Sequence, residues 1–325
     1  METKESYLLE AKNLSKYFPV KNFFGKLVQE VRAVDRVNLS IKKGETFGLV
    51  GESGCGKSTL GRTLIRMYEP TDGTLIYDGH DITRLKRKDL MDYHKRMQII
   101  FQDPYSALDP HQNVREIMAE PISVFEKLSE KQMEERIVDL LEKVGMKADD
   151  MEKYAYEFSG GQRQRIGIAR ALSVNPEFLL CDEPISALDV SIQAQVVNVL
   201  EDLQKELGLT YLFVAHDLSM VRHISDRIGV MYLGKIVESG DSDEVYDNPA
   251  HPYTRALLDS IPIADPKRAL SLEHCGIEGD LPSPLHVPSG CRFHTRCPYA
   301  TEQCRQQEPE LKERTPGHLV ACWKN

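Results

Sequence analysis

The sequence lacks several features that would assign it to common classes of protein. It has no run of about 18 apolar residues, so no segment is predicted to cross a membrane as a helix. It has no excess of positive charge, because 41 basic residues stand against 50 acidic ones and the net charge is −9. Since nucleic acid is held mainly through its phosphates, this balance argues against a nucleic-acid partner. Residues 1–6 are polar and do not resemble a secretory signal, so we expect a cytoplasmic protein.

Paired zinc ligands are also missing. In the cytoplasm, seven cysteines argue against disulfides and direct attention to metal or cluster ligation. The last four cysteines are separated by five, six and seventeen residues, without the close pairs of typical zinc sites. They are Cys291, Cys297, Cys304 and Cys322. Spacing alone leaves an iron–sulfur cluster, a zinc site and unligated thiols open. Cys275 fits no such pattern, and we interpret it as a free thiol.

Length and composition predict a globular α/β protein. With 325 residues, of which 41% are hydrophobic and 28% charged, the chain is long enough to bury a large core. Residues 8–50 look β-rich, with a loop-like insertion at 18–30. Residues 97–101, 178–181 and 211–215 read as buried strands, and residues 191–207 read as a helix. Residues 227–233 and 235–238 are predicted to form a closing hairpin. Prolines crowd after Asn248, so we place the end of the core near residue 245.

A helical segment is predicted in the middle of the chain, at about residues 105–160. Prolines punctuate its start, and Ser129 followed by Gln132 fits a capping box at a helix N-terminus. Apolar residues then recur at helical spacing as far as Gly145. We interpret this segment as a small helical insertion in the α/β core.

Residues 51–59 fit the phosphate-binding pattern G-x-x-x-x-G-K-[ST]. Residues 45–50 before them read as a buried strand, and residues 59–67 carry a helical pattern. In this context Lys57 is expected to reach the β- and γ-phosphates and the Ser58 hydroxyl to bind Mg²⁺. The predicted nucleotide-binding residues of the loop are Gly51, Ser53, Gly54, Cys55, Gly56, Lys57, Ser58 and Thr59.

Cys55 carries a prediction of its own. It lies beside Lys57 and at a helix N-terminus, both of which favour a thiolate. We therefore expect Cys55 to react faster than a buried thiol such as Cys181, and bound MgATP to shield it.

Two further motifs are candidates for phosphate chemistry. Residues 178–184 form an apolar run that ends in Asp182, placed to hold Mg²⁺, and Glu183, placed to polarise the attacking water. A second motif begins a helix with two glycines, so that free N–H groups and a serine hydroxyl can meet a phosphate. It consists of Ser159, Gly160, Gly161 and Gln162. Because the chain already has one phosphate loop, this second cradle makes most sense if it serves another subunit's nucleotide.

In their order along the chain, these motifs resemble those of ATP-binding-cassette (ABC) nucleotide-binding subunits across about residues 8–245. The resemblance implies a head-to-tail dimer with two ATPs held between the loop of one chain and the 159–162 motif of the other. Gln102 would then sense the γ-phosphate, bind Mg²⁺ and link to the membrane partner, while His216 would contact the γ-phosphate. Phe18, rather than Tyr17, is predicted to stack on adenine.

The C-terminal sequence resembles a narrower group. Residues 251–254, 281–284 and 291–298 are similar to the C-terminal region of oligopeptide/dipeptide importer ATPases. In some of those proteins four cysteines bind a [4Fe–4S] cluster, so the resemblance implies that Cys291, Cys297, Cys304 and Cys322 do so here. We expect that cluster to stabilise a proline-rich tail that has few long apolar runs.

The resemblance also implies a domain plan and a function. We predict an ABC ATPase domain at residues 1–245, with an α/β core, an antiparallel β-subdomain and the helical insertion, followed by a C-terminal extension at residues 246–325. ATP hydrolysis would energise import of di- or oligopeptides at the cytoplasmic face of the membrane. The implied partners are a sister ATP-binding subunit, two transmembrane permease subunits and, indirectly, an extracytoplasmic peptide-binding protein. An importer of nickel or another solute, and a soluble non-transport ABC protein, are the alternatives.

Overall fold

The computed structural model describes residues 7–22, 25–261 and 279–324. The expectations for residues 1–6 and for Cys275 lie outside these described residues. The chain divides into two compact units. Unit 1 comprises Met1–Ile41, Thr46–Arg84 and Ala215–Asn325, and unit 2 comprises Lys42–Glu45 and Leu85–Val214. Among the helices in the described ranges, none combines the length and the apolar character needed to cross a membrane.

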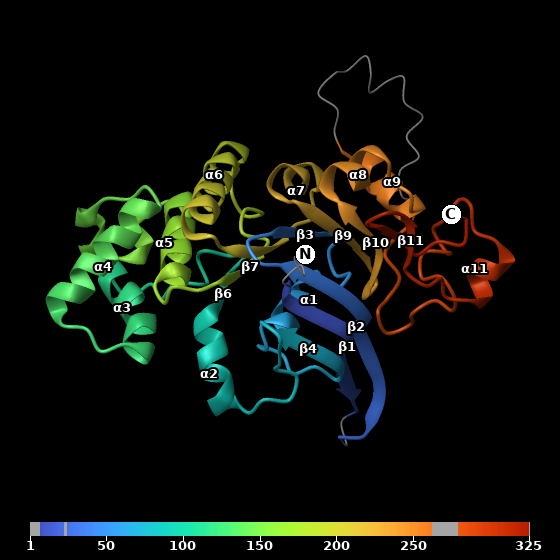
Figure 1. The fold of residues 1–325 in the computed structure, drawn as a ribbon, viewed down its shortest axis with the longest axis horizontal. Coiled ribbons are helices and arrows are strands. Elements are labelled where there is room, and N and C mark those ends of the chain that lie inside the picture. Colours follow the sequence, from blue (N-terminus) through green and yellow to red (C-terminus); the bar gives the residue numbers. More distant parts are fainter. Residues whose placement is uncertain (1–6, 23–24, 262–278, 325) are drawn as a thin grey trace, which may run out of the picture. The chain divides into compact units, whose positions relative to one another are not determined.

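Unit 1 contains a four-stranded sheet in the order β2-β1-β4-β5, in which β4 pairs antiparallel with β1 and β5 (Figure 1). Its strands are β1 (Tyr7–Lys21), β2 (Leu27–Lys42), β4 (Asp72–Tyr77) and β5 (His80–Asp81). The predicted loop at residues 18–30 is wrong, because β1 continues to Lys21 and β2 begins at Leu27. Aromatic residues favour strands, and Phe18 packs edge-on against Tyr68 with ring centroids 5.6 Å apart.

A second set of strands in unit 1 has the order β11-β12-β10-β9-β3. β3 and β9 are parallel, whereas β9 and β10 form the antiparallel hairpin that the sequence predicted. The strands are β3 (Thr46–Val50), β9 (Arg227–Tyr232), β10 (Lys235–Asp241), β11 (Lys312–Thr315) and β12 (His318–Val320). The helices described in this unit are α1 (Lys57–Leu64), α7 (Leu218–Ile224), α8 (Ser242–Asp247), α9 (Pro252–Asp259) and α11 (Glu302–Gln306).

Unit 2 contains three parallel strands in the order β8-β7-β6. They are β6 (Met97–Ile100), β7 (Phe178–Asp182) and β8 (Thr210–Val214), close to the three strands predicted there. β7 and β8 are buried along their whole length, as expected for continuous apolar runs in a parallel sheet. Its helical segments are α2 (Arg87–Arg96), α3 (Val114–Phe125), α4 (Glu130–Lys143), η1 (Ala148–Glu152), η2 (Ala155–Glu157), α5 (Gly160–Leu172) and α6 (Val190–Leu207).

The helix predicted at Ser129 is confirmed as α4. The Ser129 hydroxyl accepts a hydrogen bond from the Gln132 N–H, and the Gln132 side chain accepts one from the Ser129 N–H, which satisfies two donors at the helix start. Ile137, Leu140 and Leu141 are buried on the apolar face. α3, α4 and α5 contact one another pairwise and form a helical group within unit 2 (Figure 1).

The C-terminal segment, which we define as residues 246–325, packs on strands of unit 1 over its described ranges. Phe293 is buried against Tyr232 and Tyr253, with ring centroids 5.2 and 5.4 Å away. The buried carboxylate of Glu238 on β10 accepts hydrogen bonds from the N–H groups of Ala250 and His251 at 2.7 and 2.9 Å. Aromatic burial and charged hydrogen bonds therefore hold this segment to the core.

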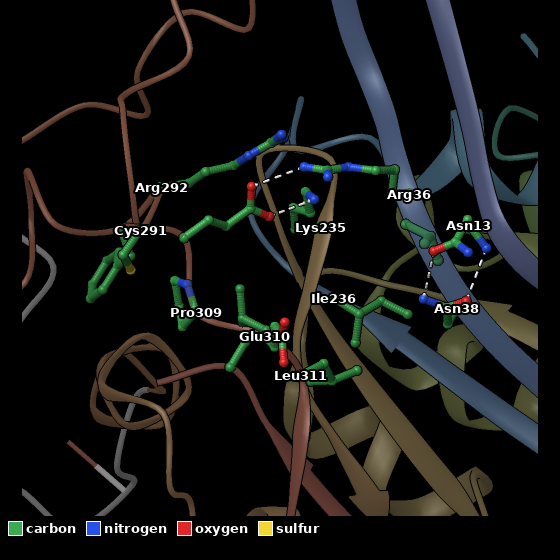
Figure 2. A pocket seen from close by; sticks show the side chains of 15 residues that line it. Asn13, Arg36, Asn38, Lys235, Ile236, Cys291, Arg292, Pro309, Glu310 and Leu311 are labelled. Atoms are coloured by element: carbon green, nitrogen blue, oxygen red, sulfur yellow. Dashed lines mark hydrogen bonds and ion pairs between the residues drawn. The ribbon is translucent and has the colours of Figure 1, made fainter. Parts of the chain in front are cut away.

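Ion pairs strengthen the same attachment. Arg292 pairs with the buried carboxylate of Asp35 on β2. Arg36 and Lys235 both reach Glu308, at 3.1 and 2.5 Å. Figure 2 shows Arg36, Lys235 and Arg292 at the wall of an open cavity of about 540 Å³ that strand residues and the C-terminal segment line together. Each of the three cations has an acidic partner, although the two carboxylates leave one positive charge in excess where the segment meets the strands.

Candidate nucleotide-binding site

The phosphate loop connects β3 to α1 in unit 1, as the sequence predicts. Gly51 and Gly56 both have positive φ, at 152° and 112°. A Cβ atom on Gly51 would lie 2.2 Å from the Met231 carbonyl oxygen, and one on Gly56 would lie 2.1 Å from the Ala33 carbonyl oxygen. Glycine is therefore required at both positions, because the loop wraps directly against the backbone of two neighbouring strands.

Lys57 is held at the mouth of this loop. Its side chain is 3% exposed, and its Nζ donates hydrogen bonds to the carbonyl oxygens of Gly51 at 2.7 Å and Glu52 at 3.1 Å. The ammonium group thus lies inside the curl of the loop, where backbone N–H groups at the start of α1 add partial positive charge. Ser53 and Gly54, at the middle of the loop, are exposed. This arrangement is a cradle for an anionic phosphate chain.

The premise that the Cys55 thiolate is favoured is wrong, whereas faster reaction than at Cys181 and shielding by MgATP stay predictions. Cys55 is 1% exposed, and burial raises the pKa of its thiol to about 11. Nearby Lys57 lowers the pKa, but this effect is smaller than that of desolvation. The thiol is therefore protonated at neutral pH and protected from solvent, so it is not an activated nucleophile.

Sequence reasoning missed two contacts to the loop. The carboxylate of Glu52 forms a bidentate ion pair with Arg296, with N–O distances of 2.7 and 3.0 Å. The N–H of Glu52 donates to the hydroxyl of Tyr253 at 2.8 Å. The hydrogen bond with Glu52 raises the pKa of Arg296, so its guanidinium remains charged. These partners lie more than 200 positions away in the sequence, and no local pattern links them to the loop.

In unit 2 the structure brings together two of the predicted catalytic residues. The side-chain amide of Gln102 donates a hydrogen bond to the Glu183 carboxylate at 2.8 Å. Glu183 follows the buried Asp182 at the end of β7 and has a φ of 50°. A residue other than glycine in this left-handed region is strained, and such strain is frequent at functional sites. This backbone conformation turns the chain sharply after β7, and the Glu183 N–H donates a hydrogen bond to the Val214 carbonyl oxygen at 3.0 Å.

The motif at residues 159–162 begins helix α5. Ser159 is the N-cap, and its hydroxyl accepts from the Gln162 N–H at 3.4 Å, while the Gln162 side chain accepts from the Ser159 N–H at 3.0 Å. A Cβ atom on Gly161 would approach the Ile192 side chain of α6 to 2.4 Å. A side chain at Gly161 would therefore displace Ile192, because this side of the α5 start packs closely on α6.

The remaining predicted site residues lie in unit 1. Phe18 is half-buried, and the Lys16 ammonium lies 5.0 Å from its ring centroid. The hydroxyl of Tyr17, the alternative adenine-stacking residue, instead donates to the Asp35 carboxylate at 2.6 Å. His216 is exposed just before α7. Ser58 and Thr59 belong to the first turn of α1.

The prediction of a [4Fe–4S] site is wrong. Within residues 7–22, 25–261 and 279–324, no group of three or more His, Cys, Asp or Glu side chains is arranged to hold a metal ion. The four thiols line a small cavity of about 150 Å³, but Cys304 Sγ lies 3.3 Å from the Thr301 hydroxyl, and Cys322 Sγ accepts from the Lys324 N–H.

The tail does not need such a cluster for its attachment. The prediction assumed that a proline-rich segment buries too little to offset its ordering entropy. Instead, it docks on unit 1 through Phe293, Arg292 and the hydrogen bonds to Glu238.

The glycine cradle, the buried lysine and the carboxylates that follow a buried strand define a P-loop nucleotide-binding protein. A family model described as "ABC transporter" matches residues 34–186. A second, described as "Oligopeptide/dipeptide transporter, C-terminal region", matches residues 237–304. The chain is 52% identical to the oligopeptide transport ATP-binding protein AppF of Bacillus subtilis, over 97% of this chain and 96% of the relative. It is 47% identical to the dipeptide transport ATP-binding protein DppF of Haemophilus influenzae, over 99% and 98%.

Solved structures agree with this relationship. CbiO1 from Clostridium perfringens, part of the ABC transporter complex CbiONQ, has a TM-score of 0.65 and 29% identity, over 75% of this chain and 92% of that one. The ATP-binding cassette MJ0796, in a dimer bound to ADP and phosphate, has a TM-score of 0.65 and 27% identity, over 72% and 98%. The chain belongs to the ABC transporter family, as one of its ATP-binding proteins, and it is an ABC-type ATPase.

Proposed function

We propose that this chain binds and hydrolyses ATP to energise the import of di- or oligopeptides through separate membrane subunits. The observation that carries the proposal is the similarity of nearly the whole chain to relatives named for oligopeptide and dipeptide transport. The match at residues 237–304 supports the same substrate class, because that family model is described by oligopeptide and dipeptide transport. A nickel importer or a non-transport ABC protein is less well supported by these similarities.

In this proposal the loop residues 51–59 wrap the phosphates of ATP, and Lys57 exchanges its carbonyl partners for β- and γ-phosphate oxygens. Magnesium would neutralise phosphate charge, and the residues proposed to hold it are Ser58, Gln102 and Asp182. They offer a hydroxyl, an amide and a carboxylate, which are the oxygen ligands that Mg²⁺ prefers. Glu183 accepts a proton from the attacking water, and its hydrogen bond with Gln102 supports a shared role in orienting that water.

The remaining motifs are proposed to complete the site in a dimer. Ser159, Gly160, Gly161 and Gln162 would bind the γ-phosphate of the nucleotide held by the other subunit, because they form a helix N-terminus at which Ser159 and Gln162 are exposed. His216 would contact the γ-phosphate, and Phe18 would stack on adenine. We favour a sister ATP-binding subunit as the partner over a second copy of this chain. The dimer reported for MJ0796 supports a paired arrangement.

The domain plan is proposed as an ATPase domain at residues 1–245, with a helical insertion at about 105–160, and a C-terminal extension at 246–325. Helices α3 and α4, which lie within this range and contact each other, support the insertion. We propose that the protein is peripheral at the cytoplasmic face of the membrane, where two permease subunits hold it. An extracytoplasmic peptide-binding protein would deliver substrate without touching this chain, and no nucleic acid is involved.

Co-purification tests this assignment. The full chain, tagged and expressed with its native membrane proteins, should be isolated in mild detergent and its partners identified by mass spectrometry. We expect two permease subunits and a second ATP-binding subunit in equal amounts. Recovery of the chain with ribosomal or DNA-repair proteins, and without a permease, would contradict a transport function.

A further inference from the structure

Residues from the C-terminal segment hold the phosphate loop at one position, Glu52. Arg296 pairs with its carboxylate through both terminal nitrogens, and the Tyr253 hydroxyl accepts from its N–H. Arg296 and Tyr253 come from separate parts of the segment, a turn and helix α9. All three residues belong to unit 1. The phosphate loop is therefore attached to residues that follow the predicted end of the ATPase core.

The two attachments are buried. Tyr253 is fully buried, and the Arg296 side chain is 6% exposed. Between them Phe293 is packed against the Tyr253 ring at 5.4 Å, and the Arg296 N–H donates to the Phe293 carbonyl at 3.0 Å. The aromatic core fixes the turn, so Arg296 is already oriented toward Glu52. A mobile arginine would lose conformational entropy on forming the same ion pair.

The position of Glu52 makes this pair important for phosphate binding. Glu52 is the second residue of a loop that must accept a polyanion, and its own carbonyl oxygen accepts a hydrogen bond from the Lys57 ammonium at 3.1 Å. An uncompensated carboxylate at this position would repel the phosphates and compete for the same lysine. A bidentate guanidinium pair cancels its charge and fixes its direction.

We propose that Arg296 is a positioning residue for ATP: it neutralises Glu52 and, together with Tyr253, sets the phosphate loop for nucleotide binding. The C-terminal segment thereby acts on the affinity for nucleotide as well as on its own docking. This inference rests on the proposed ATP-binding role of the loop. It assigns a role in nucleotide binding to a residue outside residues 51–59 and outside the other predicted nucleotide-site motifs.

The competing explanation is that the pair only fastens the C-terminal segment to the core. The two explanations predict different behaviour of single variants. If the pair is merely a fastener, Glu52→Gln and Arg296→Gln break the same contact and have the same effect. If the pair acts by neutralising the Glu52 carboxylate, Arg296→Gln leaves a negative charge beside the phosphates and weakens nucleotide binding. Glu52→Gln leaves a positive charge there and does not weaken nucleotide binding.

The test is calorimetric titration of the full-length protein with the magnesium complex of AMP-PNP, a non-hydrolysable ATP analogue. Arg296→Gln should raise the Kd roughly five- to tenfold, by Coulomb repulsion from one uncompensated charge in a partly solvated site. Glu52→Gln should bind at least as tightly as wild type, and the double variant should return to within twofold of wild type. Arg296→Lys keeps the charge but loses the bidentate geometry, so its Kd should lie between those of wild type and Arg296→Gln.

Arg292→Gln is the matched control, since Arg292 lies on the same turn but pairs with Asp35 and not with the loop. It should loosen the segment and lower the thermal midpoint while leaving the Kd within twofold. A Kd of Arg296→Gln within twofold of wild type, or equal weakening by Glu52→Gln, Arg296→Gln and Arg292→Gln, would overturn the inference. If wild-type protein bound no nucleotide, the proposed function itself would fail, and the inference with it.

Discussion

Replacement of Glu183 by glutamine tests the chemistry of hydrolysis with little disturbance of the structure. Glutamine has nearly the same size, and its side-chain oxygen can accept the hydrogen bond that Gln102 donates at 2.8 Å to the carboxylate. The strained φ of 50° is retained by either residue, so the cost of folding is unchanged. Only the basic carboxylate is lost. A change in rate can therefore be assigned to that group and not to a distorted loop.

The expected loss is large. A positioned general base contributes roughly 10²–10⁴ in rate, which corresponds to about 2.7–5.4 kcal/mol in the activation free energy. The Kd for MgATP should change by less than about twofold, because the residues that cradle the phosphates are untouched.

The assay is steady-state phosphate release by the transporter reconstituted with its membrane partners, together with ATP retention after rapid gel filtration. Glu183→Gln should release phosphate at no more than about a hundredth of the wild-type rate and should retain ATP. Glu142→Gln, an exposed acid on α4, should behave as wild type. Hydrolysis by Glu183→Gln within twofold of wild type would refute the assignment of Glu183 as the general base.

Three further predictions follow from the geometry of unit 1. Alkylation of Cys55 by iodoacetamide should be slow at pH 8 and should accelerate as the pH rises toward about 11, because the raised pKa leaves roughly a thousandth of the thiol ionised at pH 8. Mass spectrometry follows the modification, and fast modification at pH 7 would contradict this prediction. Gly56→Ala should abolish nucleotide binding in a titration, since its Cβ would meet the Ala33 carbonyl at 2.1 Å, and wild-type affinity would show that the loop is not closely packed. Phe293→Ala should destabilise the docked C-terminal segment by about 3–5 kcal/mol and expose it to limited proteolysis, whereas replacement of the exposed Tyr299 by alanine should not. Equal protease resistance of the two variants would argue against the aromatic core.

Short-range patterns predicted much of the fold. The strand, phosphate loop and first helix were predicted because buried β3, glycine spacing and helical periodicity all lie within residues 45–67. The start of α4 was predicted because its capping box involves only Ser129 and Gln132, three residues apart. The buried strands β7 and β8 were predicted for the same reason, since their apolar runs are continuous.

Properties that depend on distant neighbours were not predictable. The Cys55 thiol is neutral because packing buries it, and desolvation raises its pKa more than Lys57 lowers it. Only the neighbouring Lys57 could be seen in the sequence. The pairing of Glu52 with Arg296 joins positions 244 residues apart. Likewise, the cluster was predicted from a resemblance and from a tail expected to bury little, and the docking of Phe293 could not be seen in the sequence. Local pattern identified the candidate site, whereas its electrostatics required the tertiary structure.

Transport in a reconstituted system tests the central claim most directly. Proteoliposomes containing this chain, its membrane partners and the cognate binding protein should receive MgATP on the side that exposes the chain, and uptake of a radiolabelled dipeptide and tetrapeptide should be followed. The account predicts peptide accumulation that requires ATP, stops in Glu183→Gln and is unaffected by excess nickel. Accumulation of nickel without peptide, or peptide uptake that continues in Glu183→Gln, would contradict it.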